Sequence, residues 1–294
     1  MKNYLKYINE YASVDYDKDY THKSKSHNYA ANMKILDINE AVDYCIKNCK
    51  EFLNNPKHIS RSITASQSYF YSKPIKRHSR DNANHYTLIL DNSPHWKGYP
   101  KRSKSFICVG GLGGTYLVIP KDNSKWGICS NHDIYFSFIN SDIISINRFF
   151  VQLYYLAKYL FDMVISDKDY ELMKQDINLF QEKLYKMTFQ DVQTAIDEQY
   201  MFYMEKNKSF LSFLEKNWGK NLFDAIIETM TPVVNNFKLK SYKDLNKDLI
   251  KGYYYKEMWT DSTCLFIKQG LYMENFFELL MYKTGKDFSN FYNL

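Results

Sequence analysis

Apolar and polar positions follow two different periods along this chain, and the change of period divides it. From Ile38 to Leu53 apolar side chains recur every three or four residues, which predicts a helix that ends at Asn54-Asn55-Pro56. Between His58 and Ser137 short apolar runs alternate with Gly, Pro, Asn and Asp, which predicts strands. The expected strands are Tyr69–Tyr71, Tyr86–Leu90, Ser105–Val109, Tyr116–Ile119 and Ile134–Phe138.

The second half of the chain begins with a return of the helical period. From about Ile143 to Met230 apolar residues lie three or four apart with few breakers, which predicts a block of helices. The last part is mixed, with a short helix expected at Tyr242–Ile250, a strand at Glu257–Ile267 and a helix at Asn275–Tyr282. Because strand-like segments flank the helical block, we expect one α+β domain with an inserted block. Its parts are an N-terminal helical segment (1–55), a first β-rich half (56–140), the helical insertion (141–235) and a half with the last strand (236–294).

Composition is that of a globular protein. A chain of 294 residues with 45% hydrophobic and 24% charged residues can bury a sizeable core. Its longest apolar stretch, Phe149 to Ile165, contains Gln152, Lys158 and Asp162, which are costly in hydrocarbon, so it predicts a buried helix and no membrane association. No secretory signal pattern opens the chain, and the five cysteines lack a regular spacing. These features predict reduced thiols and a cytoplasmic location.

Metal-binding patterns are absent from the sequence. Cys45 and Cys49 share an expected helix face but have no second pair of ligands nearby, and the spacing of His78, His85 and His95 fits no metal motif. We therefore expect no metal. The glycine-rich stretch 110–114 lacks the Lys-Ser/Thr of a phosphate-binding loop and predicts a turn between strands.

Positive charge is concentrated in one segment. Between Lys73 and Lys104 there are eight basic and two acidic residues, an excess of six that equals the net charge of +6 of the whole chain. Such a segment attracts the phosphates of a dinucleotide or of a nucleic acid, although the charge alone is explained better by a solvated loop. One hypothesis is therefore a non-catalytic nucleic-acid-binding protein that stacks bases on the aromatic residues of this region, namely Tyr69, Tyr71, Tyr86, Trp96 and Tyr99.

Three short segments suggest a catalytic site. Each places a polar residue at the start or end of an expected strand: Arg61 in 58–63, Ser103 and Ser105 in 99–108, and Glu257 in 255–259. In this order they resemble the Arg, Ser-x-Ser, Glu triad of the arginine–serine–glutamate class of ADP-ribosyltransferases, which transfer ADP-ribose from NAD. Further stretches are similar to a group of phage-encoded proteins of that fold, namely 91–94, 96–99, 102–108, 114–120, 126–130 and 256–267.

The resemblance implies a fold and a set of roles. The fold would be a split β-sandwich core with an N-terminal helix and a large helical insertion, and the activity would release nicotinamide from NAD in a bacterial host cytoplasm during phage takeover. Glu257 would stabilise the positively charged ribose, Ser103 would orient Glu257, and Arg61 would hold phosphates. The residues expected to bind NAD are Arg61, Ser62, Arg102, Ser103, Ser105 and Tyr116, and those expected to contact the acceptor are Tyr253, Tyr254 and Tyr255.

The acceptor and the catalytic competence stay open at this level. Tyr255 stands where many arginine-directed transferases carry a second acidic residue, which argues against an arginine acceptor because the absent carboxylate would engage the acceptor guanidinium. The sequence leaves a protein and a nucleic acid open as acceptors, and it does not separate transfer from simple hydrolysis of NAD. The middle residue of the Ser-x-Ser segment is Lys104 rather than threonine. Besides the nucleic-acid-binding hypothesis, a degenerate transferase fold that serves as a virion or partner-binding protein is a third alternative. The oligomeric state does not follow from the sequence.

Overall fold

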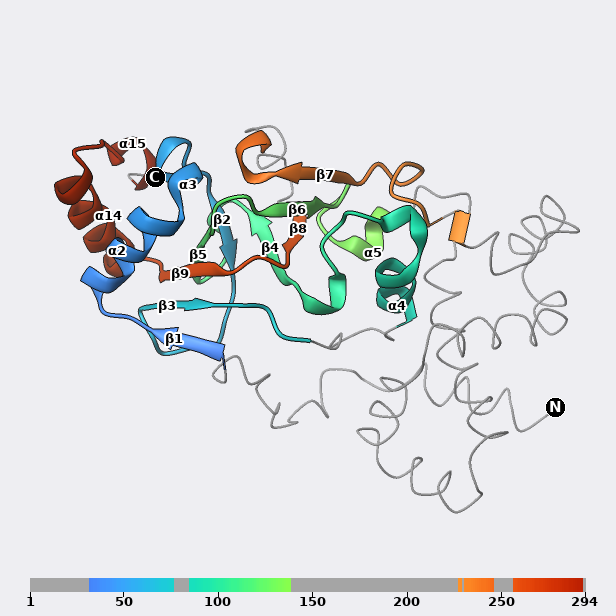
Figure 1. Ribbon diagram of the computed structural model, residues 1–294, viewed down its shortest axis with the longest axis horizontal. Coiled ribbons are helices and arrows are strands. Elements are labelled where there is room, and N and C mark those ends of the chain that lie inside the picture. Colours follow the sequence, from blue (N-terminus) through green and yellow to red (C-terminus); the bar gives the residue numbers. More distant parts are fainter. Residues whose placement is uncertain (1–31, 77–84, 139–226, 229, 246–255, 293–294) are drawn as a thin grey trace, which may run out of the picture.

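An antiparallel sheet runs through the middle of the protein, and helices gather at its two ends (Figure 1). The computed structural model describes residues 32–76, 85–138, 227–228, 230–245 and 256–292. In this part of the chain the architecture is mixed α and β, as the sequence predicts, with nine strands in one hydrogen-bonded sheet. The predicted helical block over 143–230 lies almost entirely outside the described residues.

Every pair of neighbouring strands in the sheet is antiparallel, and the order is β1-β3-β9-β5-β2-β4-β8-β6-β7. Strands that precede and strands that follow the segment 139–226 in the sequence are therefore interleaved in the sheet. β7, β8 and β9, which follow it, lie next to strands that precede it. The bounds are β1 Met33–Ile35, β2 Ile59–Arg61, β3 Tyr69–Ser72, β4 Phe106–Gly110, β5 Tyr116–Pro120, β6 Lys125–Ile128, β7 Lys238–Ser241, β8 Glu257–Thr260 and β9 Cys264–Lys268.

The short strand β2 joins two halves of the sheet. Ser60 lies opposite Val109 of β4 and opposite Leu117 of β5, whereas Arg61 continues only along β5, opposite Tyr116. The sheet thus divides where β2 leaves β4. On one side of β2 lie β5, β9, β3 and β1, and on the other β4, β8, β6 and β7.

The chain crosses between these halves near its C-terminal end. The sequence predicts one strand over Glu257–Ile267, but the structure has two: β8 pairs with β4 and β6, and β9 pairs with β3 and β5. The prediction was wrong because a short turn, in which Ser262 N–H donates to Thr260 Oγ1 at 3.2 Å, separates two apolar runs of the same character.

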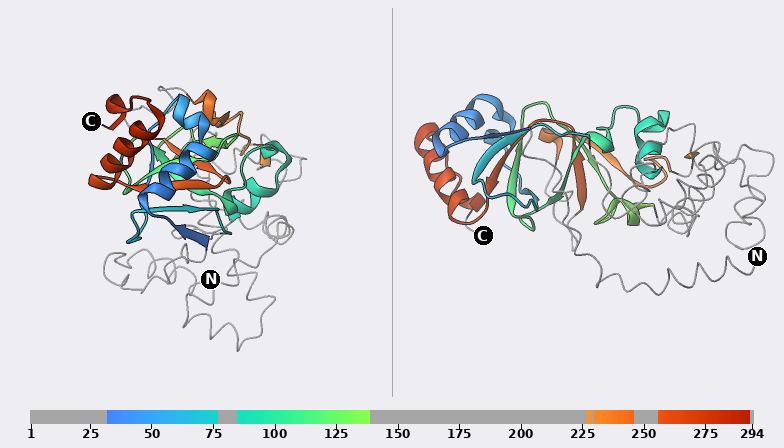
Figure 2. Two further views of the ribbon diagram at one scale, coloured as in Figure 1. Left: turned by 60° about the vertical axis from the view of Figure 1, so that its left-hand side comes forward. Right: turned by 90° about the horizontal axis from the view of Figure 1, so that it is seen from below.

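Four helices pack against the half of the sheet that contains β5, β9, β3 and β1 (Figure 2). They are α2 Ile38–Asn48, α3 Lys50–Asn54, α14 Leu271–Thr284 and α15 Ser289–Tyr292. A capping box begins α2, because Asp37 Oδ1 accepts from Glu40 N–H and Glu40 Oε2 accepts from Asp37 N–H. Phe276 and Phe277 of α14 are fully buried in the core that α2 also lines. The predicted helices at 38–53 and 275–282 are confirmed, the first with an interruption at Cys49.

Two predicted strands are helices. The segment 86–90 belongs to α4 (His85–Asn92), and 134–138 is a single helical turn, α5 (Ile134–Ser137). In α5 the turn is closed by Ser137, whose N–H and Oγ both donate to the carbonyl oxygen of Asp133. A mostly apolar segment of five residues carries too little periodicity to distinguish a strand from a helix, so tertiary contacts decide.

Several other sequence predictions can be compared directly. Strands at 69–71, 105–109 and 116–119 are confirmed to within one residue, and the glycine stretch 110–114 does connect β4 to β5. Gly114 is required there, because a Cβ on it would lie 2.5 Å from the backbone of Arg61. The short strands β1, β6 and β7 were not predicted, and of the helix expected at 242–250 the described residues contain only the 3₁₀ turn η4 (Tyr242–Asp244).

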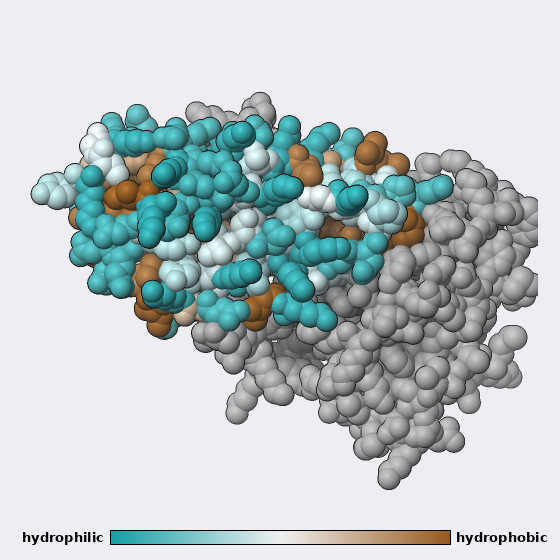
Figure 3. Space-filling view, in the orientation of Figure 1, coloured by the Kyte–Doolittle hydropathy of each residue, from teal (hydrophilic) through white to brown (hydrophobic). Residues whose placement is uncertain are grey.

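The face of the protein seen in Figure 3 is mostly hydrophilic, with small separate apolar patches. The most exposed large apolar side chains in the described residues include Val233 and Tyr282, at 84% and 87%. No helix in the described ranges has the length and apolar character that crossing a membrane requires.

Candidate active site

The three segments that carry the expected triad lie on neighbouring strands. Arg61 is the last residue of β2, Glu257 is the first residue of β8, and β4, which follows the serine segment, runs between them. Val109 of β4 lies opposite Ser60 on one side and opposite Glu257 on the other. The sheet therefore brings together segments that are up to 196 positions apart in the sequence, from 61 to 257.

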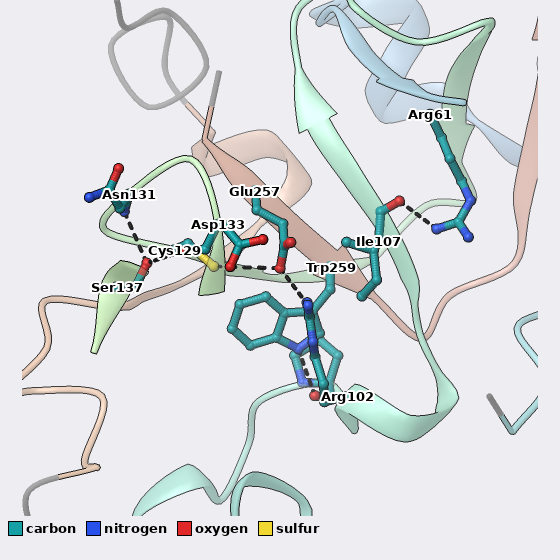
Figure 4. A network of polar contacts seen from close by, with 10 residues as sticks. Arg61, Arg102, Ile107, Cys129, Asn131, Asp133, Ser137, Glu257 and Trp259 are labelled. Atoms are coloured by element: carbon teal, nitrogen blue, oxygen red, sulfur yellow. Dashed lines mark hydrogen bonds and ion pairs between the residues drawn. The ribbon is translucent and has the colours of Figure 1, made fainter. Parts of the chain in front are cut away.

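Glu257 is held by an arginine from the serine segment. The Nη2 of Arg102 lies 2.5 Å from Glu257 Oε1, and the two side chains are 3% and 11% exposed (Figure 4). The guanidinium carbon of Arg102 also lies 5.4 Å from the centre of the Trp259 ring. This is a buried, charge-assisted ion pair placed on an aromatic ring.

A second strand fixes Glu257 from the other side. Cys129, which directly follows β6, donates its N–H to the Glu257 carbonyl at 2.9 Å, and its Sγ lies 3.8 Å from Oε1. Burial raises the pKa of the Cys129 thiol well above its ordinary value, and the nearby Glu257 carboxylate raises it further. Cys129 is therefore a neutral thiol near neutral pH, not a thiolate nucleophile.

Asp91 positions Arg102 by holding its backbone. Asp91 is buried at the end of α4, and its carboxylate accepts the N–H groups of Arg102 at 2.5 Å and of Ser103 at 3.1 Å. Ser105 Oγ donates to Lys101 O at 2.7 Å across the same turn, the 3₁₀ helix η3 (Arg102–Lys104). These bonds fix the backbone from which the Arg102 side chain reaches Glu257.

Trp259 needs a glycine on the adjacent strand. A Cβ on Gly127 of β6, the residue opposite Trp259, would lie 2.3 Å from the indole ring. The indole Nε1 donates to Pro100 O at 2.9 Å, so Trp259 also binds the segment that leads to Arg102. Gly127 thus makes room for the ring on which the Arg102 guanidinium lies.

Arg61 occupies a different place from Glu257. Since Ser60, Val109 and Glu257 are opposite one another, their side chains share one face of the sheet, and Arg61, one residue on, lies on the other face. Arg61 Nη1 donates to Ile107 O at 2.5 Å, at the point where β2 leaves β4, and Figure 4 shows its guanidinium beyond Ile107 and away from Glu257. The triad is not assembled around Glu257 as the resemblance implies.

The serines are also placed differently from the expectation. The segment that carries Ser103 and Ser105 was predicted to place them at the start of a strand, but Ser103 lies in η3 and β4 begins only at Phe106. That prediction was wrong because Asp91 turns the chain at this point by accepting two successive N–H groups. Ser105 is buried and Ser103 is half-buried.

The remaining expected site residues are spread over several places. Ser62 is exposed just after β2. Tyr116, 1% exposed on β5, has its hydroxyl 2.7 Å from Gln67 O and 3.0 Å from Ala65 O, which ties it to the chain after β2, and burial raises its pKa. Tyr253, Tyr254 and Tyr255 lie outside the described residues.

A cavity of about 300 Å³ lies next to the segment that carries Arg102. It is lined by residues that include Asp91, Trp96, Tyr99 and Lys101. Burial raises the pKa of Tyr99 to about 12, so its hydroxyl is neutral at physiological pH. The cavity thus combines aromatic walls with a lysine, and it adjoins the carboxylate that positions Arg102.

The aromatic residues of the basic segment are mostly packed inside the protein. Trp96 is 4% exposed and its Nε1 donates to Met230 O, the ring of Tyr71 stacks on that of Tyr44 at 4.6 Å, and Tyr69 donates its hydroxyl to Tyr272 O. The lysines at 73, 76, 97, 101 and 104 are exposed. This arrangement leaves a basic surface but few rings on which bases can stack.

Asp133 adds a second carboxylate near Glu257. It lies four residues after Cys129, raises the pKa of that thiol through its charge, and is drawn beside it in Figure 4. Sequence reasoning missed Asp133, and it also missed Asp91, Gly127 and Trp259, because their roles depend on the strand order. The described ranges contain no group of three or more His, Cys, Asp or Glu side chains arranged to hold an ion.

Comparison with known proteins gives no relative: no family model, no curated protein and no solved structure matches this chain.

Proposed function

We propose that this protein transfers ADP-ribose from NAD to a macromolecular acceptor and releases nicotinamide. The observation that carries the proposal is the adjacency of β2, β4 and β8, which places the arginine, serine and glutamate segments side by side with Glu257 at the start of its strand. The division of the sheet where β2 leaves β4 is also compatible with the split core that the resemblance implies.

The chemistry assigns Glu257 the central role. In the transfer, the bond between C1′ of the ribose and the ring nitrogen of nicotinamide breaks, nicotinamide leaves with the electron pair, and positive charge develops on the ribose. A carboxylate beside that carbon stabilises the transition state more than the neutral substrate. The acceptor nucleophile then bonds to C1′ and loses its proton.

Two arginines have separate roles in the proposal. Arg102, in contact with Glu257, takes the positioning role that the resemblance gives to Ser103, and its guanidinium matches phosphate oxygens as well as it matches a carboxylate. Arg61 donates to Ile107 O and so ties β2 to β4 where the halves of the sheet divide, and its contribution would be to the shape of the site.

The cavity beside Asp91 supports binding of one ring of the dinucleotide. Its volume of about 300 Å³ is at the lower end of ligand pockets and suits a single ring with its sugar. Its lining includes the half-buried Tyr99 and also Lys101, whose positive charge would favour a phosphate group.

The acceptor is proposed to be a protein or a nucleic acid. Tyr253–Tyr255, the expected acceptor loop, end two positions before Glu257 in the sequence. Tyr255 stands where many arginine-directed transferases carry a second carboxylate, but Asp133 provides a carboxylate near Glu257. This carboxylate favours a cationic acceptor group. A phage origin with action in a bacterial cytoplasm rests on the resemblance.

The test is incubation of the protein with NAD labelled in its ADP-ribose part and a bacterial lysate, followed by separation of protein from nucleic acid. We expect label in one fraction, released nicotinamide, and a loss of at least about 100-fold in both with Glu257→Gln. The matched control is Glu274→Gln, the same change at an exposed position of α14, which should keep the full rate.

The opposite result has a definite meaning. If neither label nor nicotinamide appears, or if Glu257→Gln keeps the rate of the unchanged protein, the transferase proposal is wrong. The exposed lysines between 73 and 104 would then direct attention to nucleic-acid binding, measured as affinity against salt concentration.

A further inference from the structure

The Arg102–Glu257 ion pair engages both charged groups that the proposed reaction needs. With Nη2 and Oε1 2.5 Å apart and the two residues 3% and 9% exposed, the carboxylate faces a guanidinium and not an open site. We propose that this pair is a gate that the pyrophosphate of the substrate opens: Arg102 exchanges Glu257 for the anion, and Glu257 becomes available to the ribose. The inference rests on the proposed function and adds regulation to the same site.

The backbone below Arg102 is fixed, so the exchange requires movement of one side chain. The carboxylate of Asp91 accepts the N–H groups of Arg102 and Ser103, and Ser105 closes the turn by donating to Lys101 O. Three bonds at one turn restrict the main chain. The long arginine side chain keeps its rotatable bonds and can redirect its guanidinium without moving η3.

Trp259 provides a surface along which the guanidinium can turn. The guanidinium carbon lies 5.4 Å from the ring centre, and the indole is itself fixed by its bond to Pro100 O. A cation–π contact depends on the position over the ring more than on the direction of the N–H groups. Arg102 can therefore change its hydrogen-bond partner while its contact with Trp259 persists.

The charges around Arg102 favour an anion as the competitor. Lys101 and Lys104 are exposed on either side of Arg102, and the segment from Tyr99 to Val109 contains no acidic residue. A pyrophosphate carries several negative charges on oxygens that match the guanidinium fork, whereas Glu257 offers a single charge. The charges of Lys101 and Lys104 add to its attraction, and those of Asp91 and Asp133 oppose it.

Competition makes a thermodynamic prediction that a purely structural ion pair does not make. If Glu257 and the anion compete for Arg102, loss of the carboxylate charge must increase the affinity of Arg102 for the anion. We expect Glu257→Gln to bind inorganic pyrophosphate about five- to ten-fold more tightly than the unchanged protein, since charge-assisted hydrogen bonds are worth a factor of this order or more. Arg102→Lys, which lacks the fork, should bind it more weakly.

The experiment is a titration of the full chain, labelled with ¹⁵N-arginine, with inorganic pyrophosphate while the guanidinium resonances are recorded. The chain has five arginines, so the Arg102 signal is assigned from its loss in Arg102→Lys. We expect that signal to shift saturably and the shift to reach half its value at lower pyrophosphate concentration in Glu257→Gln. Lys125→Ala, which removes an exposed cation at the start of β6, should leave the midpoint unchanged.

Other outcomes overturn the gate. An Arg102 signal that does not respond to pyrophosphate, or a midpoint that is the same with and without the Glu257 charge, contradicts it. If Glu257→Gln does not fold, Glu257→Asp replaces it, because withdrawal of the carboxylate by one methylene should shift the midpoint in the same direction. Thermal unfolding of each variant establishes that it is folded.

The gate and the transferase proposal can fail separately. An unchanged midpoint together with nicotinamide release by the unchanged protein overturns the gate alone. A tighter midpoint in Glu257→Gln without any nicotinamide release overturns the transferase proposal and leaves an anion-sensitive ion pair.

Discussion

The two halves of the sheet are buried to a similar degree but by different chemistry. In the half that α2 and α14 cover, β5 and β9 are almost fully buried and carry apolar side chains, with the aromatic rings of Phe70 and Phe266 stacked at 4.8 Å. In the other half β8 is equally buried, yet its first residue is Glu257, paired with Arg102. Burial alone therefore does not distinguish the halves.

The difference shows in which half of the sheet the buried residues are explained by their contribution to stability. Burial of apolar surface stabilises the folded state by about 25 cal/mol per Å². This stabilisation is sufficient to explain the buried apolar residues of the helix-covered half. A buried ion pair contributes little compared with apolar residues of the same size, because both charges lose their hydration. The pair in the β8 half is better explained by a role in binding or catalysis, and the following predictions test this division.

The largest effect on folding is expected in the helix-covered half. Phe276→Ala should lower the free energy of unfolding by about 3–5 kcal/mol, because Phe276 is fully buried against Tyr69 and Phe277. Urea unfolding measures the loss. Nicotinamide release, measured where the variant is folded, should be unchanged. Tyr282→Ala on the same helix, at an 87% exposed position, should cost less than about 0.5 kcal/mol.

In the β8 half, stability and activity should separate. Arg102→Met should destabilise the protein by about 3 kcal/mol, because it leaves the Glu257 carboxylate buried without its partner. The double variant Arg102→Met with Glu257→Leu should recover most of that stability but no nicotinamide release. Urea unfolding and the nicotinamide assay measure the two properties. A double variant as unstable as Arg102→Met would show that the pair is not the cause of the loss.

Alkaline pH provides a smaller test based on the buried thiols. Burial raises the pKa of Cys108 from 9.0 to about 12, an effect that the nearby Arg61 partly opposes. Because the folded-state pKa is the higher one, this stabilisation is complete below about pH 9 and is lost as the pH rises toward 12, on the order of 1 kcal/mol by pH 10. The pH dependence of urea unfolding should be shallower in Cys108→Ala. Equal slopes in the two proteins would contradict the assignment.

The smallest effects are expected for the two serines of the Ser-x-Ser segment, and their effects on stability should differ. Ser105→Ala should cost about 1 kcal/mol, because it removes the buried hydrogen bond to Lys101 O. Ser103→Ala should change stability by less than about 0.5 kcal/mol, since Ser103 contributes its backbone N–H to Asp91. Thermal unfolding of both variants compares them. A larger loss of nicotinamide release in Ser103→Ala than in Ser105→Ala would restore the role that the resemblance gives to Ser103.

Much of the element order was predictable from local pattern. The helices at 38–53 and 275–282 and the strands that became β3, β4 and β5 follow from hydrophobic period and from the breakers around them. The errors fall where that signal is short. The predicted strand 86–90 became part of α4, the predicted strand 134–138 became α5, and one strand of eleven residues became β8 and β9, because turns at Ser93-Pro94, Asp133 and Asp261–Thr263 outweighed local propensity.

The candidate site was predictable only as a set of segments. Arg61, Ser103 and Glu257 were chosen by their order along the chain, and the strand order does place their segments next to one another. The contacts differ, because alternation along β2 directs Arg61 away from Glu257, and because Asp91 turns the serine segment so that Arg102 reaches the carboxylate. Neither effect has a local sequence signal.

By itself, the amino-acid sequence determined that this chain builds an α+β core and which segments carry its polar residues, because hydrophobic period and turn residues act over a few positions. Only the tertiary structure decided which of these residues meet. Glu257 and Trp259 come from β8, Arg102 from η3 and Asp91 from α4, and their contacts depend on strand register, on the space that Gly127 leaves and on the need of a buried charge for a partner. Those are properties of the whole packed sheet.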